Sequence, residues 1–261
     1  MRVPLVLLLL TLCLPAGLIS QQRRISGLEH SSRVILMNDR YFDGNSLWGY
    51  MNGGADLYLE YGFRALRVQD LVLDSQEIRL EIFSMEDLYA SRALYSVLTD
   101  GITDSSWNNP WSFNPYQVQI VLNECYINVI NYTGSGRGLK ACIEVSELVG
   151  HRFSRLKIDT PPPLQGTKGQ WQAFFGPLGC RSIAPELDPI LEGVGPIEAW
   201  VSKDVSPKAV TGHISIPPEQ YATVESRLPR NGDKFGWSYS EGMLRLRWSA
   251  TGEQKRGEPG W

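Results

Sequence analysis

Two acidic residues whose spacing could support acid–base chemistry, Asp56 and Glu60, lie four positions apart in the stretch LWGYMNGGADLYLEYGF, residues 47–63. In a helix this spacing puts both carboxylates on one face, where they repel each other. A carboxyl group next to a second negative charge holds its proton more tightly, as a general acid or base near neutral pH must. With Tyr50 or Tyr61 nearby, the pair is a candidate site for a hydrolase.

The element that would carry this pair is an amphipathic helix over residues 47–61, begun by an N-cap at Asn45 or Ser46 and ended by Gly62. At about 100° per residue the large apolar side chains gather on one face. The opposite face contains only Gly49, Asn52, Gly53, Asp56 and Glu60.

Three glycines in one helix need an explanation, because each costs about 1 kcal/mol relative to alanine. We expect Gly54, at the border of the apolar face, to let a strand approach closely. Gly49 and Gly53 lie on the polar face, which suggests that something comes close to this backbone. The group that comes close could be another loop of the same chain, held by Asn52 and Asp56, or it could be a partner protein or a small ligand. The remaining alternative is that the two glycines have no special role.

Charge and targeting signals restrict the class of protein. The chain of 261 residues has 25 basic and 28 acidic residues, which gives no electrostatic case for binding nucleic acid. Residues 1–20 combine Arg2, an apolar run and small residues suited to cleavage, so we expect an export signal and a periplasmic or secreted protein. The apolar run is interrupted by Pro15 and is shorter than the ~20 residues that span a bilayer, which favours a cleaved signal over a membrane anchor. No second apolar stretch is long enough to span a membrane, so no stable membrane insertion is expected after cleavage. An uncleaved anchor is the alternative.

Other chemistry-bearing residues do not form a recognisable motif. A disulfide between Cys125 and Cys142 and buried free thiols are equally compatible with the spacing, and Cys180 has no obvious partner. The three histidines, His30, His151 and His213, lie far apart in sequence, so we predict no metal site and no cofactor.

Two loops could bind ligands but have simpler explanations. GSGRG, residues 134–138, lies between a strand and a helix but lacks the lysine and serine of a phosphate-binding loop, so a tight turn is expected. The loop 104–116 holds Trp107, Trp111, Phe113 and Tyr116, which either close one end of the core or stack on sugars or peptides.

The order of elements predicts an α+β fold of antiparallel sheets with helices packed on one face. Helix, strand, strand, helix, strand, strand and helix follow one another in a domain over residues 41–152. A similar order without the last helix recurs over 171–250, a pseudo-repeat that rests on element order alone. A Pro-rich linker (159–169) joins the two halves, and a disordered tail (251–261) follows. The sequence does not decide whether the halves share one sheet.

The stretch 47–63 resembles the signature of a bacterial family of exported proteins of unknown function, Leu-x-x-Tyr-Ile-Asn-Gly-Gly-Ala-Glu-x-Tyr-Leu-x-Tyr-Gly-Phe. This chain departs from it with Met51 and Asp56, and the similarity extends over about residues 40–150. The resemblance implies export but assigns no activity. We therefore expect non-enzymatic binding of a partner or small ligand, with a carboxylate-dependent hydrolase or a structural envelope component as alternatives.

Overall fold

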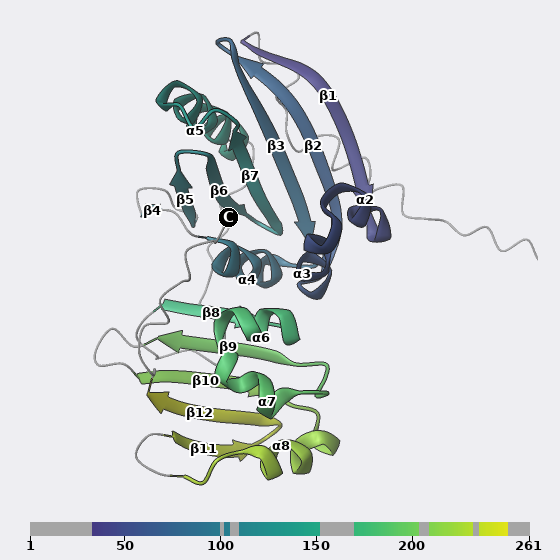
Figure 1. The fold of residues 1–261 in the computed structure, drawn as a ribbon, viewed down its shortest axis with the longest axis vertical. Helices are drawn as coiled ribbons and strands as arrows, with labels where there is room; N and C mark the ends of the chain where they lie inside the picture. The colour runs from purple at the N-terminus through teal and green to yellow at the C-terminus, as the bar shows by residue number, and fades with distance from the viewer. Residues whose placement is uncertain are drawn as a thin grey trace, which may run out of the picture.

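The computed structural model describes residues 33–99, 102–104, 110–151, 170–203, 209–231 and 235–249. The predicted signal peptide, Pro-rich linker and C-terminal tail lie outside these residues. The described residues form an α+β fold with two separate antiparallel sheets, one in each half of the chain (Figure 1). The predicted fold class is therefore confirmed, and the two halves do not share one sheet.

The first unit contains a seven-stranded sheet with helices inserted between its strands. Its elements are β1 (Val34–Asp43), the 3₁₀ turn η2 (Gly44–Leu47), α2 (Trp48–Met51), the 3₁₀ turn η3 (Asn52–Gly54), α3 (Ala55–Glu60), β2 (Phe63–Leu73), β3 (Gln76–Met85), α4 (Leu88–Leu98), β4 (Ile102–Asp104), β5 (Trp111–Asn114), β6 (Gln117–Leu122), β7 (Cys125–Asn131) and α5 (Gly136–Gly150).

The second unit is built around a five-stranded sheet. Its elements are β8 (Gln170–Phe174), α6 (Pro177–Ile183), η5 (Pro185–Leu187), α7 (Asp188–Leu191), β9 (Glu198–Lys203), β10 (Ala209–Ser215), η6 (Pro218–Gln220), α8 (Tyr221–Arg227), β11 (Phe235–Ser240) and β12 (Met243–Ser249).

The two units share one topology. The spatial order β1-β2-β3-β7-β6 in the first sheet corresponds strand by strand to β8-β9-β10-β12-β11 in the second. In both units a helical segment follows the first strand and a second helix follows the third. This correspondence supports the predicted repeat and adds an initial strand, β1 or β8, that the sequence pattern did not indicate.

Strands that lack one-sided alternation were missed by the sequence analysis. β1 lies mostly before residue 41, where the sequence analysis placed the start of the first domain, so the first sheet begins at Val34 instead. Seven of the ten residues of β1 are exposed, and a bulge between Leu36 and Asn38 interrupts its pairing with β2. Alternation is a signal only where one face of a strand is buried, so β1 carries none. β5 was assigned to the loop 104–116, and β4, most of which precedes that loop, was not predicted.

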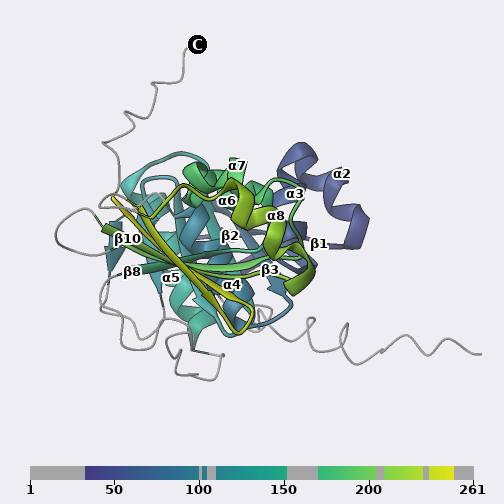
Figure 2. The same cartoon turned by 90° about the horizontal axis from the view of Figure 1, so that it is seen from below.

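Helices cover both faces of the first sheet, which corrects the expectation of a single covered face. α5 packs with Ile78, Leu80 and Ile82 on one face, while α3 and α4 pack with Phe83 and Met85 on the other. In the second unit, Figure 2 shows α6, α7 and α8 together on one side of the sheet. The helix α4 of the first unit packs against β8 of the second.

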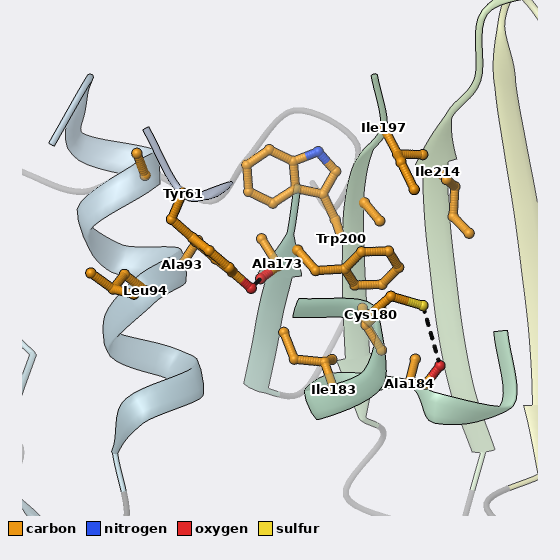
Figure 3. Close-up of a cluster of buried hydrophobic side chains, with 14 of the residues drawn as sticks. Tyr61, Ala93, Leu94, Ala173, Cys180, Ile183, Ala184, Ile197, Trp200 and Ile214 are labelled. Carbon is orange, nitrogen blue, oxygen red and sulfur yellow. Dashed lines mark hydrogen bonds between the residues drawn. The ribbon is translucent and has the colours of Figure 1, made fainter. Parts of the chain in front are cut away.

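A single apolar cluster joins the units at this junction. Figure 3 shows the Tyr61 ring between α4 of the first unit and the side chains of Ile183 and Trp200 in the second, and all belong to one buried cluster. The Tyr61 hydroxyl donates a hydrogen bond of 2.9 Å to the Ala173 carbonyl. The shared cluster therefore holds the two sheets together without joining them edge to edge.

Candidate functional site

The predicted glycine-bearing helix is not continuous. Asn52, the first residue of the short turn η3, has φ 50° and ψ −135°, and this turn separates α2 from α3. A non-glycine residue in this region of conformational space is uncommon and usually requires support from its surroundings. Leu47, Ala55 and Tyr58 nevertheless occupy the buried side, as the apolar pattern predicts.

No described segment covers the glycine face. A Cβ atom added to Gly49 or Gly53 would meet no atom within 4 Å, and one added to Gly54 would meet only the Met51 Cε, at 3.8 Å. The expected close approach of a strand at Gly54 is therefore wrong. Nothing among the described residues comes close to the backbone at Gly49 and Gly53 either, so this reason for expecting a binding site there is lost. Asn52 and Asp56 are likewise exposed to solvent.

The Glu60 side chain is directed toward the second unit. Its two carboxylate oxygens accept hydrogen bonds from the backbone N–H groups of Leu178 (2.9 Å) and Gly179 (2.7 Å), at the start of α6. A Cβ atom on Gly176 would lie 2.5 Å from the Glu60 side chain, so this approach requires glycine there. Glu60 thus holds α6 in place, and the structure does not assemble the predicted carboxylate pair.

The structure instead brings together charged residues from β1, β2 and β3 and an asparagine from β7 of the first sheet. Cross-strand pairing aligns Arg40, Val68, Glu81 and Asn128 in one row. The next row contains Asp70 and Arg79, which face each other across β2 and β3. The charged cluster is defined here as Arg40, Tyr50, Asp70, Arg79, Glu81 and Asn128.

This part of the sheet is open because the strands are longer than the helices that cover them. β2 and β3 have 11 and 10 residues, about 33 Å of extended chain. The longest helix on this face, α4, runs across the strand direction in Figure 1, so it covers the strands only over its diameter of about 10–12 Å. Figure 1 shows the strands β1, β2 and β3 running well past α3 and α4. The helices cover the Phe83 end, and the charged rows lie beyond it.

Glu81 is the most deeply buried acidic group in the cluster. It is only 8% exposed, and its carboxylate accepts hydrogen bonds from the Tyr50 hydroxyl and from the Asn128 side-chain nitrogen, the latter at 3.2 Å. Burial raises the pKa of Glu81, an effect that these hydrogen bonds and the nearby arginines oppose. Burial, and next the Glu81 charge, also raises the pKa of Tyr50.

The two arginines of the cluster share one acidic partner. Asp70 accepts from the Arg79 Nε at 2.8 Å and from an Arg40 terminal nitrogen at 3.2 Å. The Arg40 guanidinium lies 5.8 Å from the Tyr50 ring centre, and that of Arg79 lies 5.5 Å from the Tyr132 ring centre. Two positive and two negative side chains therefore give a cluster without net charge when Glu81 is ionised.

Two buried polar atoms in the cluster have no hydrogen-bond partner among the described residues. They are the donor Arg40 Nε and the acceptor Asn128 Oδ1. Beside the cluster, Met37, Val72, Arg79 and Tyr132 help to line an open hollow of about 590 Å³. Asp70 and Arg79 of the cluster line this hollow, whereas Arg40 and Asn128 do not. Unsatisfied buried polar atoms are costly, so the unpartnered donor and acceptor by themselves favour a binding role.

The remaining sequence candidates are mainly structural. Cys125, Cys142 and Cys180 are buried free thiols, so the structure contains no Cys125–Cys142 bridge.

The glycine-rich turn before α5 also has a structural role. A Cβ on Gly138 would lie 2.0 Å from the Asn131 side chain, and the Ser135 hydroxyl caps α5 by accepting from the Gly138 N–H. These contacts support the interpretation of residues 134–138 as a tight turn.

The aromatic loop divides between core and surface. Trp111 is buried and stacks on Phe113 with ring centres 5.3 Å apart, whereas Tyr116 is 61% exposed. Trp107 lies outside the described residues. His213 is half-buried and His151 is exposed, while His30 is not among the described residues. Within the described ranges no three metal-binding side chains cluster.

Sequence reasoning missed the charged cluster, although one signal was present. The strand EIRLEIF places Glu77, Arg79 and Glu81 on one face, which reads as a solvent-facing surface. Only the alignment of β1, β2, β3 and β7 shows that Glu81 is covered by Tyr50 and joined to residues distant in sequence.

Comparison with known proteins assigns no family. No family model matches the chain, and no curated protein is similar to it. Three crystal forms of the protein TP0453 align over most of the chain. Form III has 12% identity and a TM-score of 0.28 over 84% of this chain and 90% of that one. Form IV has 15% identity and a TM-score of 0.29 over 87% and 92%. A likeness this weak carries no argument about fold or function.

Proposed function

We propose that this chain is an exported, non-enzymatic protein that binds a small polar ligand at the charged cluster. The unpartnered donor and acceptor, Arg40 Nε and Asn128 Oδ1, on either side of the buried Glu81 carboxylate carry this proposal. The signal-like residues 1–20 support export. Across the described residues, no helix is both long and apolar enough to cross a bilayer.

The chemistry of the cluster indicates the class of ligand. Because Arg40 and Arg79 are balanced by Asp70 and Glu81, the cluster offers no excess charge to a strongly ionic ligand. A ligand with both hydrogen-bond donors and acceptors would satisfy the two unpartnered atoms. Polyhydroxylated or amide-bearing small molecules fit this description, and the exposed Tyr132 ring offers them an apolar contact.

A hydrolase is the second candidate, with Glu81 in place of the predicted Asp56 and Glu60. The observation in its favour is the raised pKa of Glu81 beside the Tyr50 hydroxyl, an arrangement suited to proton transfer. A structural envelope component, the third expectation, is supported by exposed Ile35, Leu36 and Met37 on the edge strand β1.

A thermal-shift screen of the mature protein tests the binding proposal. We expect a subset of neutral saccharides, polyols or amides to raise the melting temperature, since a ligand at 100 times its Kd adds about 2.7 kcal/mol to the folded state. Asn128→Ala and Glu81→Gln should abolish the shift, while Glu147→Gln, at an exposed position of α5, should retain it. Equal shifts in all variants, or turnover of the ligand by the wild-type protein, would contradict the proposal.

A further inference from the structure

We propose that residues 48–54 form a flap over Glu81, which opens to admit the ligand and is latched by Tyr50. The inference rests on the proposed function, since it concerns access to the same cluster. The flap lies between two fully buried residues, Leu47 and Ala55. No residue of the flap itself is buried.

The latch is a contact between the flap and β3. The Tyr50 hydroxyl donates to the Glu81 carboxylate, and its ring packs on Phe42 with ring centres 4.9 Å apart. The Arg40 guanidinium lies against the same ring. Displacing Tyr50 would therefore expose Glu81 and Arg40 together, while Asn128 would remain hydrogen-bonded to the carboxylate from β7.

The glycines on both sides of Tyr50 act as hinges. In the observed conformation Gly49, Gly53 and Gly54 have room for a Cβ, and none of them has a positive φ. Alanine would fit at each and would favour the helical state. The observed closed conformation therefore does not require glycine at these positions. The backbone freedom of glycine is needed when residues 48–54 change to the open conformation. Asn52, with φ 50°, already departs from helical geometry at the second hinge.

The chain immediately after the flap is firmly held. The Tyr58 ring packs 4.5 Å from that of Phe83, and Glu60 binds the first N–H groups of α6. Movement of α3 would break both the core and the junction between the units. Opening is therefore confined to the segment between Leu47 and Ala55.

Hydrogen exchange of the mature protein without ligand tests the flap directly. We expect amides of residues 48–54 to exchange faster than those of α3. Tyr50→Phe removes the latch hydrogen bond and should accelerate exchange in the flap about tenfold or more, because hydrogen bonds to charged groups are the strong ones. Gly53→Ala combined with Gly54→Ala should slow it. Gly136→Ala, at an exposed position of α5 where a Cβ also has room, is the matched control and should leave flap exchange unchanged.

The flap would be rejected if Tyr50→Phe left exchange in residues 48–54 unchanged, or if it accelerated exchange equally in α3 and α5. It would also be rejected if the double alanine variant exchanged in the flap as fast as the wild type. Unchanged exchange in α5 verifies that each variant is folded. The exchange experiment contains no ligand, so a negative result rejects the flap without affecting the thermal-shift evidence for ligand binding. A negative thermal-shift result likewise rejects ligand binding without affecting the exchange evidence for the flap.

Discussion

The two units of this protein share one strand order but use it differently. β8, β9 and β10 have 5, 6 and 7 residues, while β1, β2 and β3 have 10, 11 and 10. In the second unit, apolar residues such as Ile214, Leu244 and Leu246 are buried under the helices. In the first unit the strands continue past the helices and carry the charged cluster. The short strands of the second unit are covered by its helices and form a closed scaffold. The longer strands of the first unit extend past its helices and leave part of the sheet as an open surface.

The largest expected effect comes from breaking the closed unit. Leu244 is 0% exposed in the apolar row of β12. Replacing it with alanine should cost about 2–5 kcal/mol, because the transfer free energy is lost and a cavity remains. Urea unfolding measures this cost. Arg79→Ala in the open row should cost much less, and equal costs would contradict the division into closed and open units.

The junction between the units should be the next most sensitive place. Glu60→Ala removes the acceptor for two N–H groups at the start of α6. We expect a loss of about 1–2 kcal/mol, typical of a lost helix cap. Chemical denaturation of Glu60→Ala and Glu60→Gln measures it, and Gln should retain part of the stability. A neutral result for Glu60→Ala would show that the cap does not hold the units together.

The open unit should show its own dependence on pH. Burial raises the pKa of Glu81 above its ordinary value, so the folded state holds this proton more tightly than the unfolded state does. The contribution of Glu81 to stability is then complete below the unfolded pKa, near 4.5, and is lost as pH rises through the folded pKa. The measured free energy of unfolding should therefore fall between pH 4 and 8 as Glu81 loses its proton. Glu81→Gln, which cannot ionise, should lack this part of the fall. An identical pH profile for the variant would contradict the assignment.

The smallest effect is expected at the residue that the sequence first suggested. Asp56 is exposed on α3, and Asp56→Ala should change stability by less than about 0.5 kcal/mol. Ligand-induced thermal shifts should also be unaffected. A clear loss of binding in this variant would return the site to the glycine face and away from the charged cluster.

Local patterns were sufficient for part of this structure. Alternation in residues 77–83 predicted the strand β3 correctly, because Ile78, Leu80 and Ile82 lie on a buried face. The apolar side of residues 47–61 was also predicted, since Leu47, Ala55 and Tyr58 follow the helical period. The break at Asn52 was not predicted, because the period continues across it.

The sequence by itself determined the α+β class, the main hairpins and the apolar faces, since these depend on neighbours within a few positions along the chain. The tertiary structure alone decided that Glu60 binds α6 rather than acting with Asp56. It also decided that Arg40, Asp70, Glu81 and Asn128 lie together. Their contacts depend on the register of strands far apart in sequence, and shifting one strand by a single residue would turn its side chains to the other face of the sheet.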